Sequence, residues 1–146
     1  MNRTKTAARI LAFLAALLLL ITSLTACEGG VTREETKTAM DAFLTALDSE
    51  NYAEAAALYH PDAAMTEELL AAFAEQVKTK VGIDLTEGAT VEKITGISSS
   101  YYDSTVGGSR YELTARIKAG DKTAFLTVEV IRNDKGYGIF KVECNP

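Results

Sequence analysis

Few residues of this chain have the chemistry for proton transfer. Histidine is the residue type best suited to proton transfer near neutral pH, and the chain has a single one, His60, which Asp62 follows closely. Tyr111 is the phenol expected on the buried face of a strand. These three residues are the candidates for general acid-base catalysis. A lone histidine in a Tyr-His-Pro-Asp turn is more typically a capping or surface residue, so we expect no catalysis at His60.

A second candidate site is the pair Tyr101 and Tyr102, beside a glycine-rich loop. Tyrosine supplies contact area at low entropic cost, so this pair is a candidate binding edge for a sugar or a protein. Adjacent strand residues face opposite sides of a sheet, and we therefore expect one ring in the core and the other in solvent.

Metal and cofactor chemistry lacks residues of the right types and spacing. No cluster of histidine and cysteine occurs, and the acidic pair Glu67-Glu68 is typical of the first turn of a helix. The glycines Gly107-Gly108 precede no helical pattern, which argues against a phosphate-binding loop. We therefore expect no metal and no cofactor.

The first residues have the pattern of an export signal. Three basic residues and no acidic one precede an apolar stretch, residues 10–24, that is 15 residues long. A membrane-spanning helix needs about 20 such residues, so the stretch is more typical of a signal peptide.

This apolar stretch ends in Leu24-Thr25-Ala26-Cys27, which resembles the lipobox of bacterial lipoproteins. The resemblance implies cleavage between Ala26 and Cys27 and attachment of fatty acids, such as palmitate, to Cys27. Two acyl chains anchor a protein stably where one does not. We expect an extracytoplasmic, lipid-anchored protein of the cell envelope, on the cell membrane or on an outer membrane where one exists.

Without residues 1–26 the chain retains 120 residues, enough for one domain, and a formal charge of −8. Nucleic acid is a poor partner for such a charge. We assign residues 27–31 to a flexible lipidated tether and 32–146 to a single α+β domain. With Cys27 lipidated, Cys144 has no partner for a disulfide, and we interpret it as a small apolar residue of a strand.

Three helices are expected in the first half of the domain. Thr32 and Glu35 form a capping box for a helix over residues 33–48, and Asn51 caps a second over 51–59. A third helix runs from its cap at Thr66 to Gly82, which suits a left-handed C-terminal position.

After Ala89 the helical spacing of apolar residues is replaced by alternation of apolar and polar residues. This alternation predicts strands over 90–99, 110–118, 123–132 and 137–144. The first is extendable through Tyr102 with a bulge at Gly96. On the last strand we expect Phe140, Val142 and Cys144 to face the core. Short glycine-containing turns favour antiparallel hairpins, and the helices should cover one face of a curved sheet of about four strands.

This order of elements, with the passage Tyr-Ala-Glu-Ala-Ala-Ala-Leu-Tyr-His-Pro-Asp-Ala over residues 52–63, is similar to the nuclear transport factor 2-like superfamily. The resemblance implies a cone-shaped α+β fold whose sheet curls around a pocket, with dimers formed through the open sheet face in many members. Its enzymes place Asp, His or Tyr inside the cone, whereas the residues expected there in this chain are almost all apolar.

These observations favour a non-catalytic lipoprotein that binds a small apolar ligand or an envelope protein, with a homodimer as a further possibility. Two alternatives remain: an enzyme of the cyclase, isomerase or hydrolase kind that uses a pocket acid-base residue, and a structural envelope protein without a pocket.

Overall fold

The structure is a computed structural model that describes residues 29–146. The predicted signal peptide, its cleavage site between Ala26 and Cys27, and the lipidation site at Cys27 lie outside the described residues.

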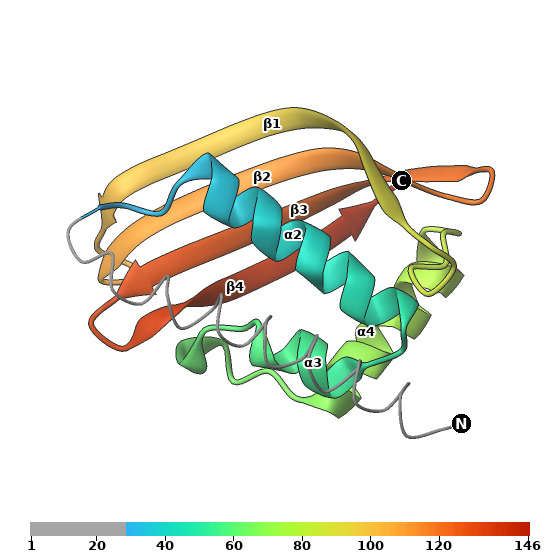
Figure 1. Cartoon of the computed structure of the whole chain (residues 1–146), viewed down its shortest axis with the longest axis horizontal. Helices are drawn as coiled ribbons and strands as arrows, with labels where there is room; N and C mark the ends of the chain where they lie inside the picture. Colours follow the sequence, from blue (N-terminus) through green and yellow to red (C-terminus); the bar gives the residue numbers. More distant parts are fainter. Residues whose placement is uncertain (1–28) are drawn as a thin grey trace, which may run out of the picture.

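Within residues 29–146, three α-helices and one short 3-10 helix precede four strands along the chain (Figure 1). The helices are α2 (Arg33–Asp48), α3 (Tyr52–Ala57), η2 (Pro61–Ala63) and α4 (Glu67–Lys80). The strands are β1 (Thr90–Asp103), β2 (Gly108–Ala119), β3 (Lys122–Asn133) and β4 (Gly136–Asn145), which pair antiparallel in the order β1-β2-β3-β4. The predicted α+β class with a curved four-stranded antiparallel sheet is confirmed.

Local capping determines where the helices begin. The Thr32 hydroxyl accepts a hydrogen bond from the Glu35 amide at 3.2 Å, and the Glu35 carboxylate accepts one from the Thr32 amide at 2.8 Å. Asn51 and Thr66 cap α3 and α4 in the same way, through their side-chain oxygens. Gly82 follows α4 with φ of +84°, a conformation that costs glycine little. These helix starts were predictable because each depends on residues within one turn.

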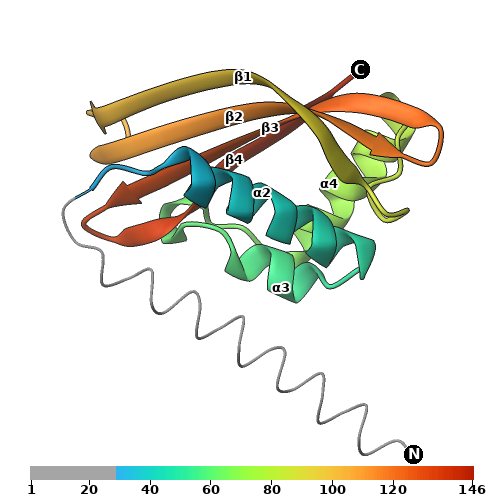
Figure 2. The ribbon, with the colours of Figure 1, turned by 45° about the horizontal axis from the view of Figure 1, so that its top comes forward.

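The three α-helices cover one face of the sheet, and the other face is open to solvent (Figure 2). Helix α2 lies against β2 and β3, while α3 packs against α2 and α4. The Phe43 ring is central to the helical layer, with its centroid 6.2 Å from that of Tyr59 and 6.3 Å from that of Phe73. The largest core side chains are fully buried, among them Met40, Phe43, Leu47, Leu70, Leu113, Ile117 and Leu126.

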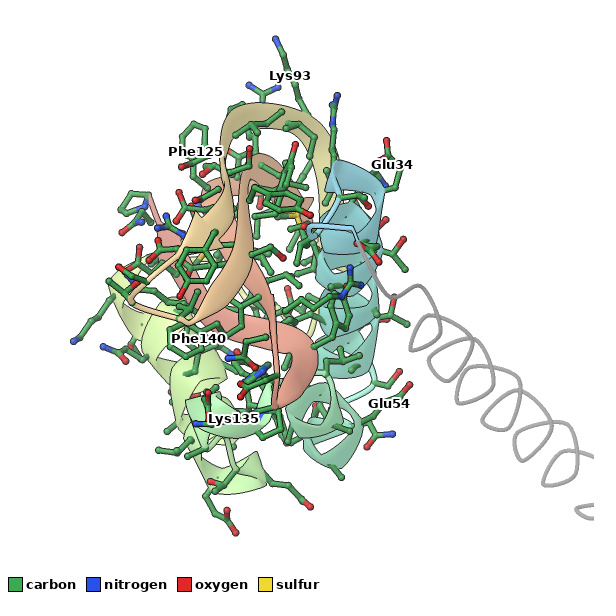
Figure 3. The ribbon with its side chains drawn as sticks, turned by 90° about the vertical axis from the view of Figure 1, so that its left-hand side faces the viewer. Glu34, Glu54, Lys93, Phe125, Lys135 and Phe140 are labelled. Carbon is green, nitrogen blue, oxygen red and sulfur yellow. The ribbon has the colours of Figure 1, made fainter. Side chains whose placement is uncertain are left out.

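The inward face of β4 differs from the prediction. The pairing of β3 with β4 shifts register between Glu129 and Val130, and this bulge places Ile139 in the core with no exposed surface. Phe140, which we expected in the core, is only half-buried and lies outside the core cluster (Figure 3). Val142 and Cys144 pack against the core as predicted. One inserted residue is enough to exchange the faces of a strand, because side chains alternate with period two.

Strand β1 forms one edge of the sheet and is irregular along its length. Its pairing with β2 shifts register three times, between Val91 and Lys93, between Ile94 and Gly96, and between Ser100 and Asp103. The second shift agrees with the bulge predicted at Gly96. Such bulges bend a strand and increase its twist, which accounts for the curvature of this edge.

Candidate functional site

His60 is buried, with 1% of its surface exposed, and both of its ring nitrogens are engaged by the protein. Nδ1 accepts a hydrogen bond from the Asp62 amide at 3.0 Å, and Nε2 lies 2.9 Å from Oδ1 of Asn133. That oxygen also accepts from the Lys135 amide, so it is an acceptor, and Nε2 is therefore the nitrogen that carries the proton. The expected capping role is confirmed, since His60 caps η2, whereas the alternative of a surface position is wrong.

Asp62 lies beside this histidine but belongs to a solvated charge cluster. Its carboxylate is 3.1 Å from Lys135 Nζ and 3.4 Å from Asn133 Nδ2. The hydrogen bond from Lys135, above all, holds the pKa of Asp62 below its ordinary value. Asp62 thus remains ionised at neutral pH and is unsuited to donate a proton there.

Tyr111 is distant from both. It is half-buried against the core on β2 and is paired with Val130, which is paired in turn with Ile139 of β4. Tyr59, next to His60, forms an isolated β-bridge with Ile139 on the edge of β4 that faces away from β3. Three strand spacings therefore separate Tyr111 from this segment, about 14 Å. The structure brings His60 and Asp62 together but does not bring Tyr111 to them.

Tyr101 and Tyr102 are both exposed, at 77% and 67% of their surfaces. The expectation that one ring would lie in the core is wrong, because the register shift between Ser100 and Asp103 interrupts the alternation of faces at these residues. The Tyr101 ring lies beside the start of the domain, since a Cβ on Gly30 would be 3.3 Å from its Cδ2 atom.

The first described residues are bound to the sheet, although we expected a flexible tether. The Arg132 guanidinium donates to the Gly29 carbonyl at 3.1 Å and to the Glu35 carboxylate at 2.7 Å, and it stacks over the Tyr137 ring at 4.9 Å. The Val31 amide donates to Ser109 Oγ at 3.0 Å, so the domain extends to residue 29 at this end.

We call the contacts of Arg132 with Gly29 and Glu35 the Arg132 clamp. The pKa of Glu35 agrees with an ion pair between Glu35 and Arg132. Burial acts to raise the pKa of Glu35, but hydrogen bonds from Arg132 and Thr32 outweigh it and hold the pKa below its ordinary value. Burial raises the pKa of Tyr137 to about 12. No local sequence pattern indicates these contacts, because Arg132 lies 97 positions from Glu35.

An open cleft of about 460 Å³ separates α2 from the first half of β1. Lys37, Asp41, Leu44 and Thr45 line it from the helix, and residues 89–94 line it from the strand. Successive side chains of a strand point to opposite faces, so a run of consecutive lining residues shows that the strand edge itself borders the cleft. No sequence pattern had indicated this cleft.

A charged cluster occupies the open face of the sheet. The guanidinium nitrogens of Arg110 lie 3.3 Å from a carboxylate oxygen of Asp103, 3.3 Å from one of Glu129 and 3.7 Å from one of Glu112. Burial raises the pKa of Glu129, while Arg110 opposes the rise. The one feature of the sequence that indicated this cluster is Glu129, an acidic residue within the otherwise apolar run of residues 128–131.

Cys144 is half-buried, and burial raises the pKa of its thiol to about 11. In the part of the chain that the structure describes, no group of three or more histidine, cysteine or acidic side chains is arranged to hold a metal ion. None of the helices in residues 29–146 has the length and apolar character needed to cross a membrane.

Comparisons of the chain with models of protein families, with curated proteins and with solved structures gave no match.

Proposed function

We propose that this protein is a bacterial lipoprotein, held on the extracytoplasmic side of a membrane by fatty acids on Cys27. The support comes from the sequence: a basic start, an apolar stretch too short to span a bilayer, and the residues Leu24-Thr25-Ala26 before the cysteine. Two residues after Cys27, Gly29 is already hydrogen-bonded to Arg132 of the domain.

We assign the domain to the nuclear transport factor 2-like fold. Three helices against one face of a curved antiparallel sheet support this assignment. Large core side chains such as Phe43, Leu113 and Leu126 are fully buried. Such buried apolar side chains favour binding at the surface over binding inside the cone.

The domain's function is to bind an envelope protein without catalysis. One contrast carries this proposal: both nitrogens of His60 are engaged within the protein, whereas the cleft beside β1 is open. Within residues 29–146, the edge of β1 bordering the cleft has no strand beyond it, and an extended segment of a partner can pair with such an edge by β-strand addition. Half-buried apolar lining residues such as Val91 and Ile94 would contact side chains of the partner.

Lipidation is tested on the full-length chain, expressed in a bacterium with a radiolabelled or alkyne-bearing palmitate. We expect label in the parent and in C144S, the matched control, and none in C27S. Label that persists in C27S would refute the proposed anchor.

Partner binding is tested with a photo-crosslinking residue placed at Thr90, at the cleft, in lipidated protein in intact cells. We expect a discrete adduct with one envelope protein, and none from the same residue at Phe125, which lies on the open side of the sheet (Figure 3). Reversing a lining charge, in K93E, should reduce the yield. Native mass spectrometry of the purified protein tests the alternative. A small molecule retained by the protein would contradict the proposal and favour a small ligand.

A further inference from the structure

The domain begins at one end of the sheet, where the β1–β2 and β3–β4 turns also lie (Figure 1). Gly29 is bound to Arg132 and Val31 to Ser109, so the point at which the chain leaves the domain is held in place. Two residues span at most about 7 Å, which places residue 27 within that distance of Gly29.

The two most exposed aromatic side chains of the described residues, Tyr101 and Tyr102, lie at this same end. The turn that follows, residues 104–107, carries no charged side chain. The one acidic residue between the tyrosines and the turn, Asp103, is paired with Arg110. An uncharged turn next to two exposed phenols contrasts with the acidic character of the whole domain.

We infer that Tyr101, Tyr102 and the turn over residues 104–107 form a membrane-contacting surface, which rests in the headgroup layer of the bilayer that holds the lipid. This inference rests on the proposed lipidation of Cys27. A lipid attached within about 7 Å of the Arg132 clamp brings this end of the sheet to the bilayer. Tyrosine is enriched at that depth, because its ring is apolar and its hydroxyl group remains hydrated.

The orientation has a consequence for the cleft. Thr90, at the cleft, is 11 residues from Tyr101 along β1, or roughly 35 Å of extended strand. With the tyrosines at the bilayer and Gly29 held by Arg132, Thr90 and the part of the cleft around it lie far from the lipid, where a partner can reach them.

The protein contains no tryptophan, so a single introduced indole reports its own environment. The experiment uses full-length lipidated Y101W and Y102W in phosphatidylcholine vesicles with brominated acyl chains. F125W is the matched control, because Phe125 is 40% exposed on β3 but pairs with Arg116 near the opposite end of the sheet. We expect about twofold or greater quenching and a blue shift in Y101W and Y102W, and neither in F125W.

A further variant, R132Q in the Y101W protein, releases Gly29 from the clamp. Its quenching should fall toward that of F125W while its circular dichroism spectrum is retained. Full quenching in R132Q would overturn the orienting role of Arg132.

The palmitate label separates failure of this inference from failure of the proposed anchor. If the chains carry label but Y101W and Y102W are quenched no more than F125W, the membrane-contacting surface is refuted and the anchor stands. If the chains carry no label, the anchor is refuted and the membrane-contacting surface with it.

Discussion

His60 and Asn133 are 73 positions apart, yet Nε2 of the histidine lies 2.9 Å from Oδ1 of the asparagine. The Asn133 amide group also donates to the Val106 carbonyl at 2.8 Å. One histidine and one asparagine thus connect η2, the β3–β4 turn and the β1–β2 turn. This arrangement is that of a structural residue, because neither imidazole nitrogen is left for a substrate.

We predict that H60A lowers the free energy of unfolding by about 2–4 kcal/mol, since it removes a buried ring, its hydrogen bond with Asn133 and the acceptor of the Asp62 amide. Urea denaturation of the purified protein measures the change. D62A is the matched control and should lower the free energy of unfolding much less than H60A, because the ion pair of Asp62 with Lys135 is exposed to solvent. An H60A protein that keeps its stability but loses a catalytic turnover would instead favour the enzyme alternative.

Gly138 is required by the close approach of η2 to β4. A Cβ at this position would lie 2.5 Å from the backbone nitrogen of His60 and 2.7 Å from the carbonyl carbon of Tyr59. We expect G138A to destabilise the fold by about 2 kcal/mol or more, because backbone atoms cannot yield as a flexible side chain can. Thermal unfolding checks this against G29A, where no atom lies within 4 Å of the new Cβ. Equal melting temperatures for the two variants would contradict the prediction.

Asp84 should make the free energy of unfolding depend on pH in the acidic range. The hydrogen bond from Lys78, followed by those from Thr86, lowers its pKa from 3.8 to about 2. The stabilisation is complete above the unfolded-state value of 3.8 and is lost as the pH falls toward about 2. We expect a loss of roughly 1 kcal/mol over this window, reduced from the full linkage because Lys78 is exposed.

The measurement for Asp84 is urea denaturation at several pH values between 2 and 5. D84N should lose less stability than the parent over this window, whereas D121N, in the β2–β3 turn, should follow the parent. If D84N and the parent lose the same stability, the ionised Asp84 carboxylate does not support the fold.

Cys144 should be an unreactive thiol. Burial raises its pKa to about 11, and the thiolate is the form that attacks electrophiles. In native C27S protein at pH 8 we expect reaction with a disulfide reagent at least about tenfold slower than in urea. A variant with Ser104 replaced by cysteine, and without both natural cysteines, provides the exposed control. Native Cys144 reacting as fast as that control would contradict its burial.

The local sequence determined where the elements lie. The caps at Thr32, Asn51 and Thr66 and the left-handed position at Gly82 each depend on neighbours within a few residues. Alternation and turn residues likewise placed the strands close to their observed bounds. Such features are predictable because hydrogen bonds within a turn and the period of a strand are properties of the local chain.

Tertiary pairing decided which side chains meet and which face they occupy. The register shift beside Val130 moved Phe140 out of the core, and the shift beyond Ser100 exposed both tyrosines. The contacts of His60 with Asn133 and of Arg132 with Gly29 join residues that are 73 and 103 positions apart. A bulge changes the parity of a strand at the position where two distant segments pair, and no periodicity within either segment records that position.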